Sequence, residues 1–158
     1  MLRLLSEANW PDIQREMSRM LREGIQSANV RKLAELAISN KEDHVVAIHQ
    51  FVKLHFPYAP DPADMELFIH PNRMALDYFD GRQRMGDCDD LALLTAAMMG
   101  SIGYSVRIQL IDVNLDGEID HAVSQVKDGV LGWLNIDSSN TKPLGWELPT
   151  THTITVEP

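Results

Sequence analysis

Hydrophobic residues in the first third of the chain recur at helical spacing. Between residues 10 and 25 they fall three or four positions apart, and Pro11 suits a first helical turn. A second pattern of the same kind covers residues 30–38, and Asn40 can cap a third helix that runs to residue 54. The pattern therefore predicts three helices before residue 56.

The middle of the chain changes character twice. Residues 56–84 contain four prolines and little periodicity, which is typical of a long irregular connection, and long ordered loops are often functional. Residues 91–99 are then apolar on every side except for Thr95, which indicates a buried helix. Gly100 or Gly103 can end that helix.

From residue 104 onward the hydrophobic period falls from 3.6 to 2, which is the period of a half-buried strand. We expect strands at residues 104–110, 119–126, 130–137 and 151–156. Because the helices precede the strands in two blocks, the order favours an α+β fold with an antiparallel sheet. The predicted division is a helical extension, residues 1–39, and a core, residues 40–158.

Composition narrows the class of protein. A chain of 158 residues suits one domain, and its net charge of −9 argues against a nucleic-acid partner. No apolar stretch approaches the ~20 residues of a membrane span, and the start does not resemble a signal peptide. A single cysteine excludes an internal disulfide and a thiolate-rich zinc site. We expect a cytoplasmic protein with no membrane partner, metal or cofactor.

The single cysteine, Cys88, falls in the first turn of the predicted buried helix, with Asp87 as its N-cap. A helix N-terminus presents unpaired N–H groups and partial positive charge, which favour a reactive thiolate and can hold an oxyanion. Against this, Asp87, Asp89 and Asp90 would raise the pKa of the thiol. A buried, inert cysteine is the structural alternative.

Six histidines are present, and one has a partner in the predicted pattern. His44, His49 and His55 are not spaced to align as a metal pair on a helix, and they are better explained as solvated or core residues. His70 and His152 have no obvious partner. His121 lies on the predicted strand 119–126, whose neighbour ends in an aspartate, which suggests a base with its orienting group.

The geometry of that pair depends on the loop between the two strands. If residues 127–129 form a three-residue hairpin loop, Gly129 takes the left-handed position and His121 faces Asn135. Asp137 then lies on the same face as His121, as a diagonal neighbour. A two-residue loop would place Asp137 on the opposite face. We expect the three-residue loop.

A second acidic segment imitates half of a calcium site. Asp112, Asn114, Asp116 and Gly117 match the first half of a calcium-binding loop. The bidentate glutamate that completes such a loop is replaced by Val123, and strands flank the segment in place of helices. A hairpin turn at residues 116–117 is the simpler interpretation.

Taken together, these segments resemble the transglutaminase-like superfamily, which shares its Cys, His, Asp order with papain-like peptidases. The resemblance rests on residues 86–90 (Gly-Asp-Cys-Asp-Asp) before an apolar helix, on residues 103–107, on His121-Ala122, and on Gly132-Trp133 ahead of Asp137. Residues 48–52 and 56–58 also resemble the helix and aromatic turn upstream of the family cysteine. The similarity covers roughly residues 40–140.

The resemblance implies roles for individual residues. Cys88 would be the nucleophile, His121 the acid and base, and Asp137 the orienter of the imidazole. Trp133 matches the family tryptophan four residues before the aspartate, whereas Val123 stands where the family often has an aromatic residue.

Three further residues complete the predicted site. Gln83, Asp87 and Trp133 are candidates for oxyanion stabilisation or substrate binding, and an exposed loop position is the alternative for Gln83.

These features lead to a functional hypothesis with two alternatives. We expect a cysteine-nucleophile acyl-transfer enzyme that acts on amide bonds of a protein or peptide substrate, most simply a peptidase or amidase. One alternative is a cross-linking transglutaminase, in which a lysine amine replaces water. The other is an inactive member that serves as a binding or assembly module, which the acidic flank of Cys88 and the N-terminal helices would suit.

Overall fold

The computed structural model describes residues 2–4, 9–62, 67–150 and 152–158, with residues 2–4 described by their backbone alone. Residue 151 of the last predicted strand, and most of the segment before residue 9, lie outside this description. Within these ranges the chain forms five helices: α1 (Trp10–Gln26), α2 (Ala28–Ile38), α3 (His44–His55), α4 (Pro71–Phe79) and α5 (Cys88–Ser101). The strands are β1 (Leu2–Leu4), β2 (Leu67–Ile69), β3 (Val106–Ile111), β4 (His121–Asp128), β5 (Gly132–Ile136) and β6 (Thr153–Val156).

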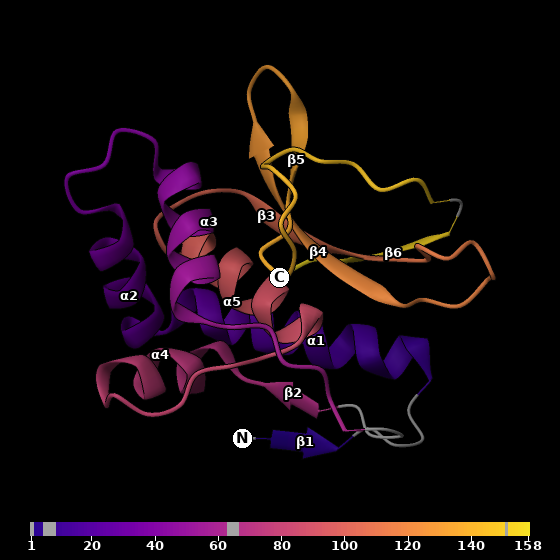
Figure 1. Cartoon of the computed structure of the whole chain (residues 1–158), viewed down its shortest axis with the longest axis horizontal. Coiled ribbons are helices and arrows are strands. Elements are labelled where there is room, and N and C mark those ends of the chain that lie inside the picture. The colour runs from indigo at the N-terminus through magenta and orange to yellow at the C-terminus, as the bar shows by residue number, and fades with distance from the viewer. Residues whose placement is uncertain (1, 5–8, 63–66, 151) are drawn as a thin grey trace.

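The predicted α+β class is confirmed. The four C-terminal strands form one antiparallel sheet in the order β5-β4-β3-β6, and β1 pairs antiparallel with β2 in a separate ribbon. The sheet lies over the helices, and the β4–β5 hairpin projects beyond the rest of the molecule (Figure 1).

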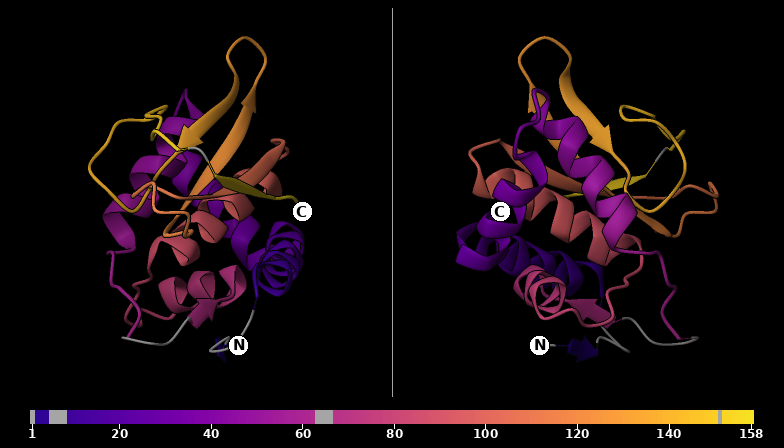
Figure 2. Two further views of the ribbon diagram at one scale, coloured as in Figure 1. Left: turned by 90° about the vertical axis from the view of Figure 1, so that its right-hand side faces the viewer. Right: turned by 60° about the vertical axis from the view of Figure 1, so that its left-hand side comes forward.

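Helix α5 is the centre of the core. Its residues from Asp90 to Met99 are all buried, as expected for a helix that is apolar on every side. Helices α1, α2, α3 and α4 contact α5 from several sides, and β3 and β4 cover the remaining side. The two turned views show these helices gathered below the sheet (Figure 2).

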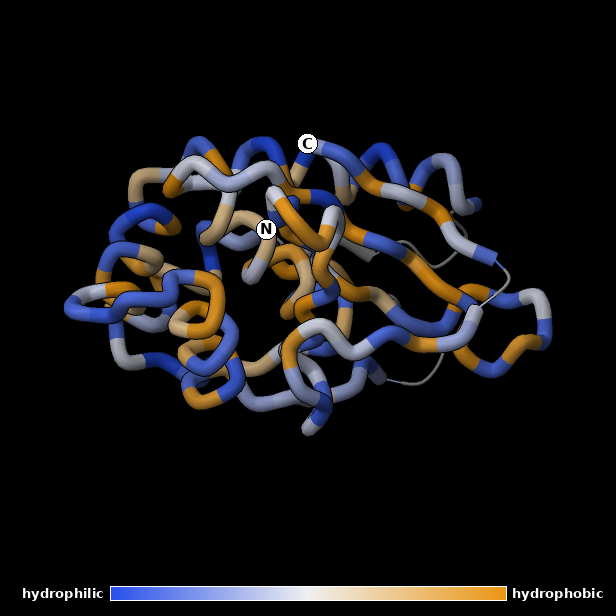
Figure 3. Tube along the Cα trace, turned by 90° about the horizontal axis from the view of Figure 1, so that it is seen from above, coloured by the Kyte–Doolittle hydropathy of each residue, from blue (hydrophilic) through white to orange (hydrophobic). Residues whose placement is uncertain are grey.

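The sheet buries one face against α5. Val106, Ile108 and Leu110 alternate with polar residues along β3, and Ala122 and Val126, which pair with Leu110 and Val106, lie on the same face from β4. Hydrophobic and hydrophilic segments alternate visibly along these strands (Figure 3). The opposite face carries a ladder of amide side chains, in which Gln125 accepts a hydrogen bond from Arg107 at 2.6 Å.

The N-terminal helices share the core of the rest of the chain. Met17 and Leu21 of α1, together with Leu33 of α2, are fully buried in the same cluster as the α5 side chains. At Gly24 a Cβ would lie 2.9 Å from the Cβ of Ala97, so glycine allows α1 to approach α5 closely. The segment predicted as an extension therefore packs as part of a single core.

Two expectations about local structure are wrong. Helix α3 is capped by Asp43, whose carboxylate accepts from the Val46 amide, whereas Asn40 adopts a positive φ of 59° in the preceding turn. The segment 56–84 also contains β2 and α4. Pro71 begins α4, a position that suits its missing N–H, so this proline marks a helix start within the predicted loop.

The β4–β5 loop has the predicted three residues but lies two positions further along the chain. Asp128 pairs with Gly132, so residues 129–131 form the loop, and the left-handed glycine is Gly132 (φ 76°), not Gly129. Asn135 consequently pairs with Gln125 rather than with His121.

A displacement of two residues keeps every side chain on its predicted face. Continued past the end of β5, the observed register places Asp137 opposite Val123, so it is again a diagonal neighbour of His121. The predicted relation between His121 and Asp137 is therefore preserved although the predicted pairing is not.

Candidate active site

Cys88 is placed by the N-terminus of α5. The Asp87 carboxylate accepts hydrogen bonds from the Asp89 and Asp90 amides at 3.1 and 3.3 Å. The Asp90 carboxylate in turn accepts from the Asp87 amide at 3.2 Å, which closes a capping box around the first turn. A Cβ at Gly86 would lie 2.6 Å from the Asp90 Cβ, so glycine is required directly before this cap.

Tyr58 is brought beside the cysteine by a short backbone bridge. The amide of Gly86 donates to the Pro57 carbonyl at 3.3 Å, and the amide of Ala59 donates to the Gly86 carbonyl at 2.9 Å. Burial, and then the charges of Cys88 and Asp87, raise the pKa of the Tyr58 hydroxyl. Sequence reasoning assigned Tyr58 no role, although its aromatic turn formed part of the family resemblance.

His121 and Asp137 form a close pair across the end of the sheet. His121 Nε2 lies 2.6 Å from Asp137 Oδ2, and their side chains are 16% and 5% exposed. Because Nε2 bonds to the carboxylate, Nδ1 is the ring nitrogen left for proton exchange on the other side of the imidazole. The structure thus brings together the two residues that the strand pattern paired.

The turn after β5 fixes the Asp137 carboxylate. Its Oδ1 accepts from the amide and the hydroxyl of Ser139 at 3.0 and 2.6 Å, and its Oδ2 also accepts from the Asn140 side chain at 2.6 Å. Burial alone would raise the pKa of Asp137, but the hydrogen bonds from His121 and Ser139 outweigh it and lower that pKa. The carboxylate is therefore held ionised in one orientation.

The main chain of the same turn is tied to two helices. His49 of α3, which is buried, places its Nε2 3.1 Å from the carbonyl oxygen of Asp137. The hydroxyl of Ser138 lies 3.0 Å from that of Thr95 on α5. Sequence reasoning placed His49 among the solvated or core histidines, and its helical spacing carries no signal of this long-range contact.

Cys88 approaches β4 where β5 no longer covers it. Along β4 the amides of even-numbered residues point toward β5, and β5 ends at Ile136, opposite Ser124. The next such amide, that of Ala122, hydrogen-bonds to the Cys88 sulfur and lowers the pKa of the thiol. The end of β5 therefore opens the place where the sulfur meets the strand that carries His121.

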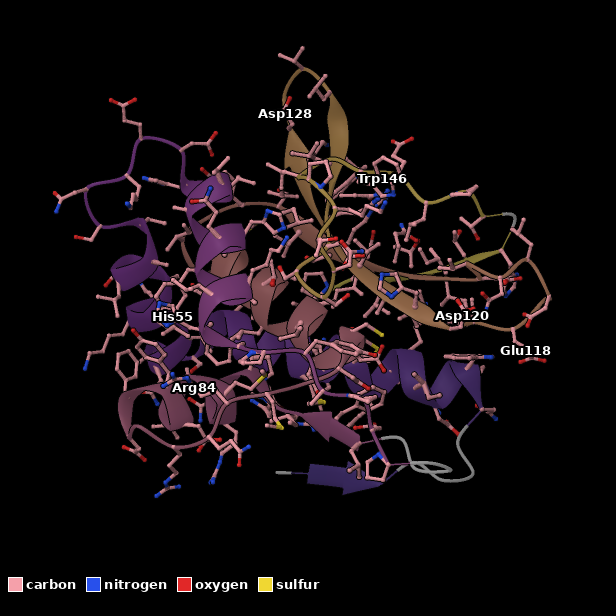
Figure 4. The ribbon with its side chains drawn as sticks, viewed as in Figure 1. His55, Arg84, Glu118, Asp120, Asp128 and Trp146 are labelled. Atoms are coloured by element: carbon pink, nitrogen blue, oxygen red, sulfur yellow. The ribbon has the colours of Figure 1, made fainter. Side chains whose placement is uncertain are left out.

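Cys88 and His121 line one cleft with a volume of about 210 Å³. Helix α1 and the segments around Tyr58, Cys88 and His121 form its walls. The lining residues are Trp10, Ile13, Met17, Tyr58, Pro60, Asp61, Asp87, Cys88, Asp89, Leu110, Ile119, Asp120 and His121. Asp120 lies at the end of the molecule where α1 begins, far from Asp128 at the other end of β4 (Figure 4).

The surroundings of Cys88 oppose a thiolate. Burial raises the pKa of the thiol well above its usual range, and the Asp89 and Asp87 carboxylates raise it further. The thiol donates to Asp89 Oδ1 at 3.6 Å. The acidic flank expected from the sequence is therefore present in space and acts on the sulfur.

Two of the predicted accessory residues lie elsewhere. Gln83 is exposed, contacts Met85 Sδ at 3.9 Å, and lines a separate pocket beside α4. Trp133 lies toward the projecting end of β5, where its ring centroid is 4.1 Å from the Arg107 guanidinium carbon. The structure brings Asp87 to the cleft and places Gln83 and Trp133 outside its lining.

Three carboxylates that could hold a metal ion lie together at the cleft: Asp61 and Asp87 line it, and Asp90 is buried beside them. Asp61, Asp87 and Asp90 each offer an oxygen within 4.8 Å of the others. Burial and the nearby Asp87 raise the pKa of Asp90 to about 8, which disfavours a charged Asp90 carboxylate as a metal ligand near neutral pH. In the acidic loop, the Asp112 oxygens accept from the Asp116 and Gly117 amides at 3.2 and 2.6 Å, so that carboxylate closes a turn.

A larger hollow, of about 1070 Å³, lies between α1 and the last strand. It contains four arginines, but Arg15 and Arg19 form ion pairs along α1, and Arg107 bonds to Gln125. Neither the cysteine nor a histidine lines this hollow, so the cleft at Cys88 is where the candidate chemistry lies.

Comparisons with known proteins bear on the fold and on the family. Within the ranges that the structure describes, no helix is both long and apolar enough to cross a membrane. No curated protein matches the sequence. A solved structure described as a "Putative Cysteine Protease" from Cytophaga hutchinsonii is similar, with a TM-score of 0.54 and 17% identity. The match covers 81% of this chain and 40% of that chain, so this chain spans less than half of that protein's length.

The family model of the transglutaminase-like superfamily matches residues 31–138. The match includes α3, the start of α5 with Cys88, and the His121–Asp137 pair. It covers more than half of the 158 residues. The chain therefore belongs to the transglutaminase-like superfamily.

Proposed function

We propose that this protein is a cysteine-dependent amide hydrolase, a peptidase or amidase, with Cys88, His121 and Asp137 as its catalytic residues. The observation that carries the proposal is the shared cleft. A cysteine at a helix N-terminus and a histidine held 2.6 Å from a buried carboxylate line the same small cavity. A nucleophile, a base and a group that orients the base are the three parts that covalent acyl transfer requires.

The first half of the reaction forms a thioester. His121 Nδ1 takes the proton of the Cys88 thiol while Nε2–H donates to Asp137, and the sulfur attacks the amide carbonyl carbon. In this proposal the oxyanion at the start of α5 accepts hydrogen bonds from the backbone N–H of Cys88 and from the hydroxyl of Tyr58, whose pKa responds to the charge of Cys88. The C–N bond then breaks, and the imidazolium gives its proton to the leaving amine.

The second half regenerates the enzyme. His121 removes a proton from water, hydroxide attacks the thioester carbonyl carbon, and the C–S bond breaks. The sulfur recovers a proton from His121, so a carboxylic acid and an amine are the products. If a lysine amine replaces water, the same steps give a cross-link, and the reaction becomes that of a transglutaminase.

One observation favours a non-catalytic alternative. Burial and the carboxylates of Asp89 and Asp87 raise the pKa of Cys88, so the resting sulfur is a neutral thiol. A superfamily member with an unreactive thiol would act as a binding or assembly module. The hydrolase proposal requires that His121, or the substrate itself, overcome this unfavourable charge.

A library of fluorogenic aminoacyl and peptidyl amides tests the proposal, with the intact thioester sought by mass spectrometry after acid quench. Wild type is compared with Cys88→Ala, His121→Ala and the distant surface variant Glu42→Gln. We expect turnover in wild type and Glu42→Gln, none in Cys88→Ala, and a decrease of roughly 10²- to 10⁴-fold in His121→Ala. Addition of a primary amine separates hydrolysis from transamidation, because only the transferase would form the amine adduct. Turnover that survives Cys88→Ala would contradict the proposal.

A further inference from the structure

We propose that Thr95 is a positioning residue for the reaction, because its hydroxyl ties the turn after β5 (residues 137–140) to the helix that begins at Cys88. Thr95 Oγ1 lies 3.0 Å from the Ser138 hydroxyl, and Ser138 directly follows Asp137. This role rests on the proposed function, since Thr95 touches neither the sulfur nor the imidazole and acts through Asp137.

The hydroxyl of Thr95 is an exception in the middle of α5. Every other side chain from Leu91 to Met99 is apolar, and Thr95 itself is fully buried. A buried hydroxyl costs free energy unless it is hydrogen-bonded, and a threonine within a helix can bond to the carbonyl oxygen one turn back. Thr95 instead bonds to a hydroxyl 43 positions away in the sequence, so this bond joins two separate elements of the fold.

Cys88 and Thr95 lie on the same face of α5. They are seven positions apart, which is close to two helical turns, or about 10 Å along the helix axis. A helix keeps this distance by its own backbone hydrogen bonds. One rigid element therefore carries the nucleophile at its start and, two turns later, holds the turn that orients the base.

The turn needs an anchor outside the sheet. The pairing of β5 with β4 ends at Ile136, so the ladder does not hold the residues that follow. His49 of α3 holds the Asp137 carbonyl oxygen at 3.1 Å, and Thr95 of α5 holds the next side chain. His121, in contrast, is held by the pairing of β4 with β3. The base and the group that orients it are thus fixed by different parts of the fold.

The contact between these two groups leaves little tolerance. His121 Nε2 lies 2.6 Å from Asp137 Oδ2, and a misplacement of about 1 Å in an active site can lower a rate by up to ~100-fold. The bonds from Ser139 and Asn140 to the Asp137 carboxylate lie within the turn and would move with it. They orient the carboxylate locally but do not fix its place relative to the imidazole.

A purely structural role for the same bond predicts a different result. Thr95→Val alone leaves the Ser138 hydroxyl buried without a partner and should destabilise the fold. Thr95→Val combined with Ser138→Ala removes both partners, so the free energy of unfolding should return toward that of wild type. If the bond serves stability alone, the properties of the active site should return as well. If it positions the turn, they should remain impaired.

The test compares wild type with this double variant and with two controls. Thr95→Ser keeps the hydroxyl. Ser101→Ala removes a hydroxyl from the same helix, but one whose hydrogen bond, to the Met98 carbonyl oxygen at 2.7 Å, stays within α5.

Three measurements need no enzyme substrate. Urea denaturation gives the free energy of unfolding. The low-field proton NMR signal of the His121 Nε2–H, assigned by its loss in His121→Ala, reports the hydrogen bond to Asp137. The rate of Cys88 alkylation by iodoacetamide at neutral pH reports the effect of the imidazole on the sulfur.

In the double variant we expect stability close to that of wild type, a low-field signal that is shifted or lost, and alkylation that is several-fold slower. If an amide substrate is found, kcat should fall by about tenfold with KM little changed, because no contact with substrate is removed. Thr95→Ser and Ser101→Ala should keep the signal and the alkylation rate of wild type.

Ser138→Ala alone provides a second variant should the double variant fail to fold. In it the Thr95 hydroxyl can turn to the Leu91 carbonyl oxygen, one turn back in α5, so the fold should persist while the turn loses its anchor. The same changes in signal and alkylation are expected.

The outcomes separate the two proposals. An unchanged low-field signal or an unchanged alkylation rate in the folded variants would overturn the positioning role, even if the protein hydrolyses amides. Equal changes in Ser101→Ala would overturn it too. A changed signal and slower alkylation, with no turnover of any amide by wild type, would support the role of Thr95 and remove the hydrolase.

Discussion

The groups around Asp137 favour its ionised form, whereas the groups on the other side of the cleft disfavour ionisation of Cys88. On the base side, the Asp137 carboxylate accepts hydrogen bonds from His121, Ser139 and Asn140, and its carbonyl oxygen is held by His49. On the nucleophile side, Cys88 is close to Asp87 and Asp89, and both raise the pKa of its thiol.

The difference shows that the fold prepares the base, His121, before substrate binds, but does not prepare the nucleophile, Cys88. The base side is rigid and oriented before any substrate arrives, which is the arrangement that efficient proton transfer requires. The nucleophile side is positioned by a capping box but is not activated by its surroundings. Activation of the sulfur must come from His121 across the cleft or from the substrate.

The largest expected effect comes from breaking the base side. His121→Ala removes the group that transfers protons, so turnover of any identified amide substrate should fall by roughly 10²- to 10⁴-fold. The fold should persist, because His121 lies at the start of β4 and its side chain is outside the hydrophobic core. Initial-rate assays measure the loss of turnover, and circular dichroism checks that the variant is folded. Undiminished turnover would exclude His121 as the acid and base.

The buried carboxyl beneath the nucleophile should make stability depend on pH. Burial raises the pKa of Asp90 to about 8, so between pH ~4 and ~8 the folded carboxyl is protonated while the unfolded one is ionised. The contribution of Asp90 to the free energy of unfolding is therefore complete below pH ~4 and is lost as the pH rises from ~4 to ~8. Above pH ~8 it does not change further.

Three histidines have lowered pKa values, so they make the stability rise with pH, which is the opposite trend: His49, His55 and His70. Because they are present in both proteins, comparison of wild type with Asp90→Asn isolates the contribution of Asp90. Urea denaturation measures the free energy of unfolding at pH 5 and at pH 8. Between these two values it should fall by on the order of a few kcal/mol more in wild type than in the variant. A difference that is the same at both pH values would show that Asp90 is ionised in the folded protein.

His49 tests how the base side is held. His49→Leu leaves the Asp137 carbonyl oxygen buried without its donor, which should reduce the free energy of unfolding by about 1–3 kcal/mol. His49→Gln retains an N–H donor at the same place and should recover part of the loss. Urea denaturation measures both, and equal stability of the two variants would show that the hydrogen bond has no role.

The smallest expected effect sharpens the nucleophile side. Asp89→Asn removes the charge nearest the sulfur and should lower the pKa of Cys88. The change appears as a shift of the pH dependence of alkylation by iodoacetamide. No shift would mean that burial alone sets the pKa of this thiol.

Local patterns in the sequence predicted the parts of the site that depend on local structure. The start of α5 at Cys88 follows from the capping residue and the apolar run. His121 and Asp137 share a face of the sheet because side chains alternate between the two faces along each strand. The loop between those strands was misplaced because Gly129 and Gly132 both suit a left-handed position.

The contacts that sequence reasoning missed are long-range. His49 reaches Asp137 across 88 positions of the chain, and α1 brings Trp10 to the cleft through core packing that helical spacing alone does not specify. The proline-rich pattern around Pro71 predicts a loop, whereas Pro71 is the first residue of helix α4.

The central claim, that His121 acts on the Cys88 sulfur, is tested most directly by the pH dependence of alkylation in wild type and in His121→Ala. The account predicts that the rate at neutral pH falls by about tenfold or more in the variant, because the imidazole no longer takes the thiol proton or faces the thiolate as a cation. Asp137→Asn should move the profile in the same direction, by less. Superimposable profiles, with a single inflection above the free-cysteine value of ~8.5 in each protein, would contradict the account.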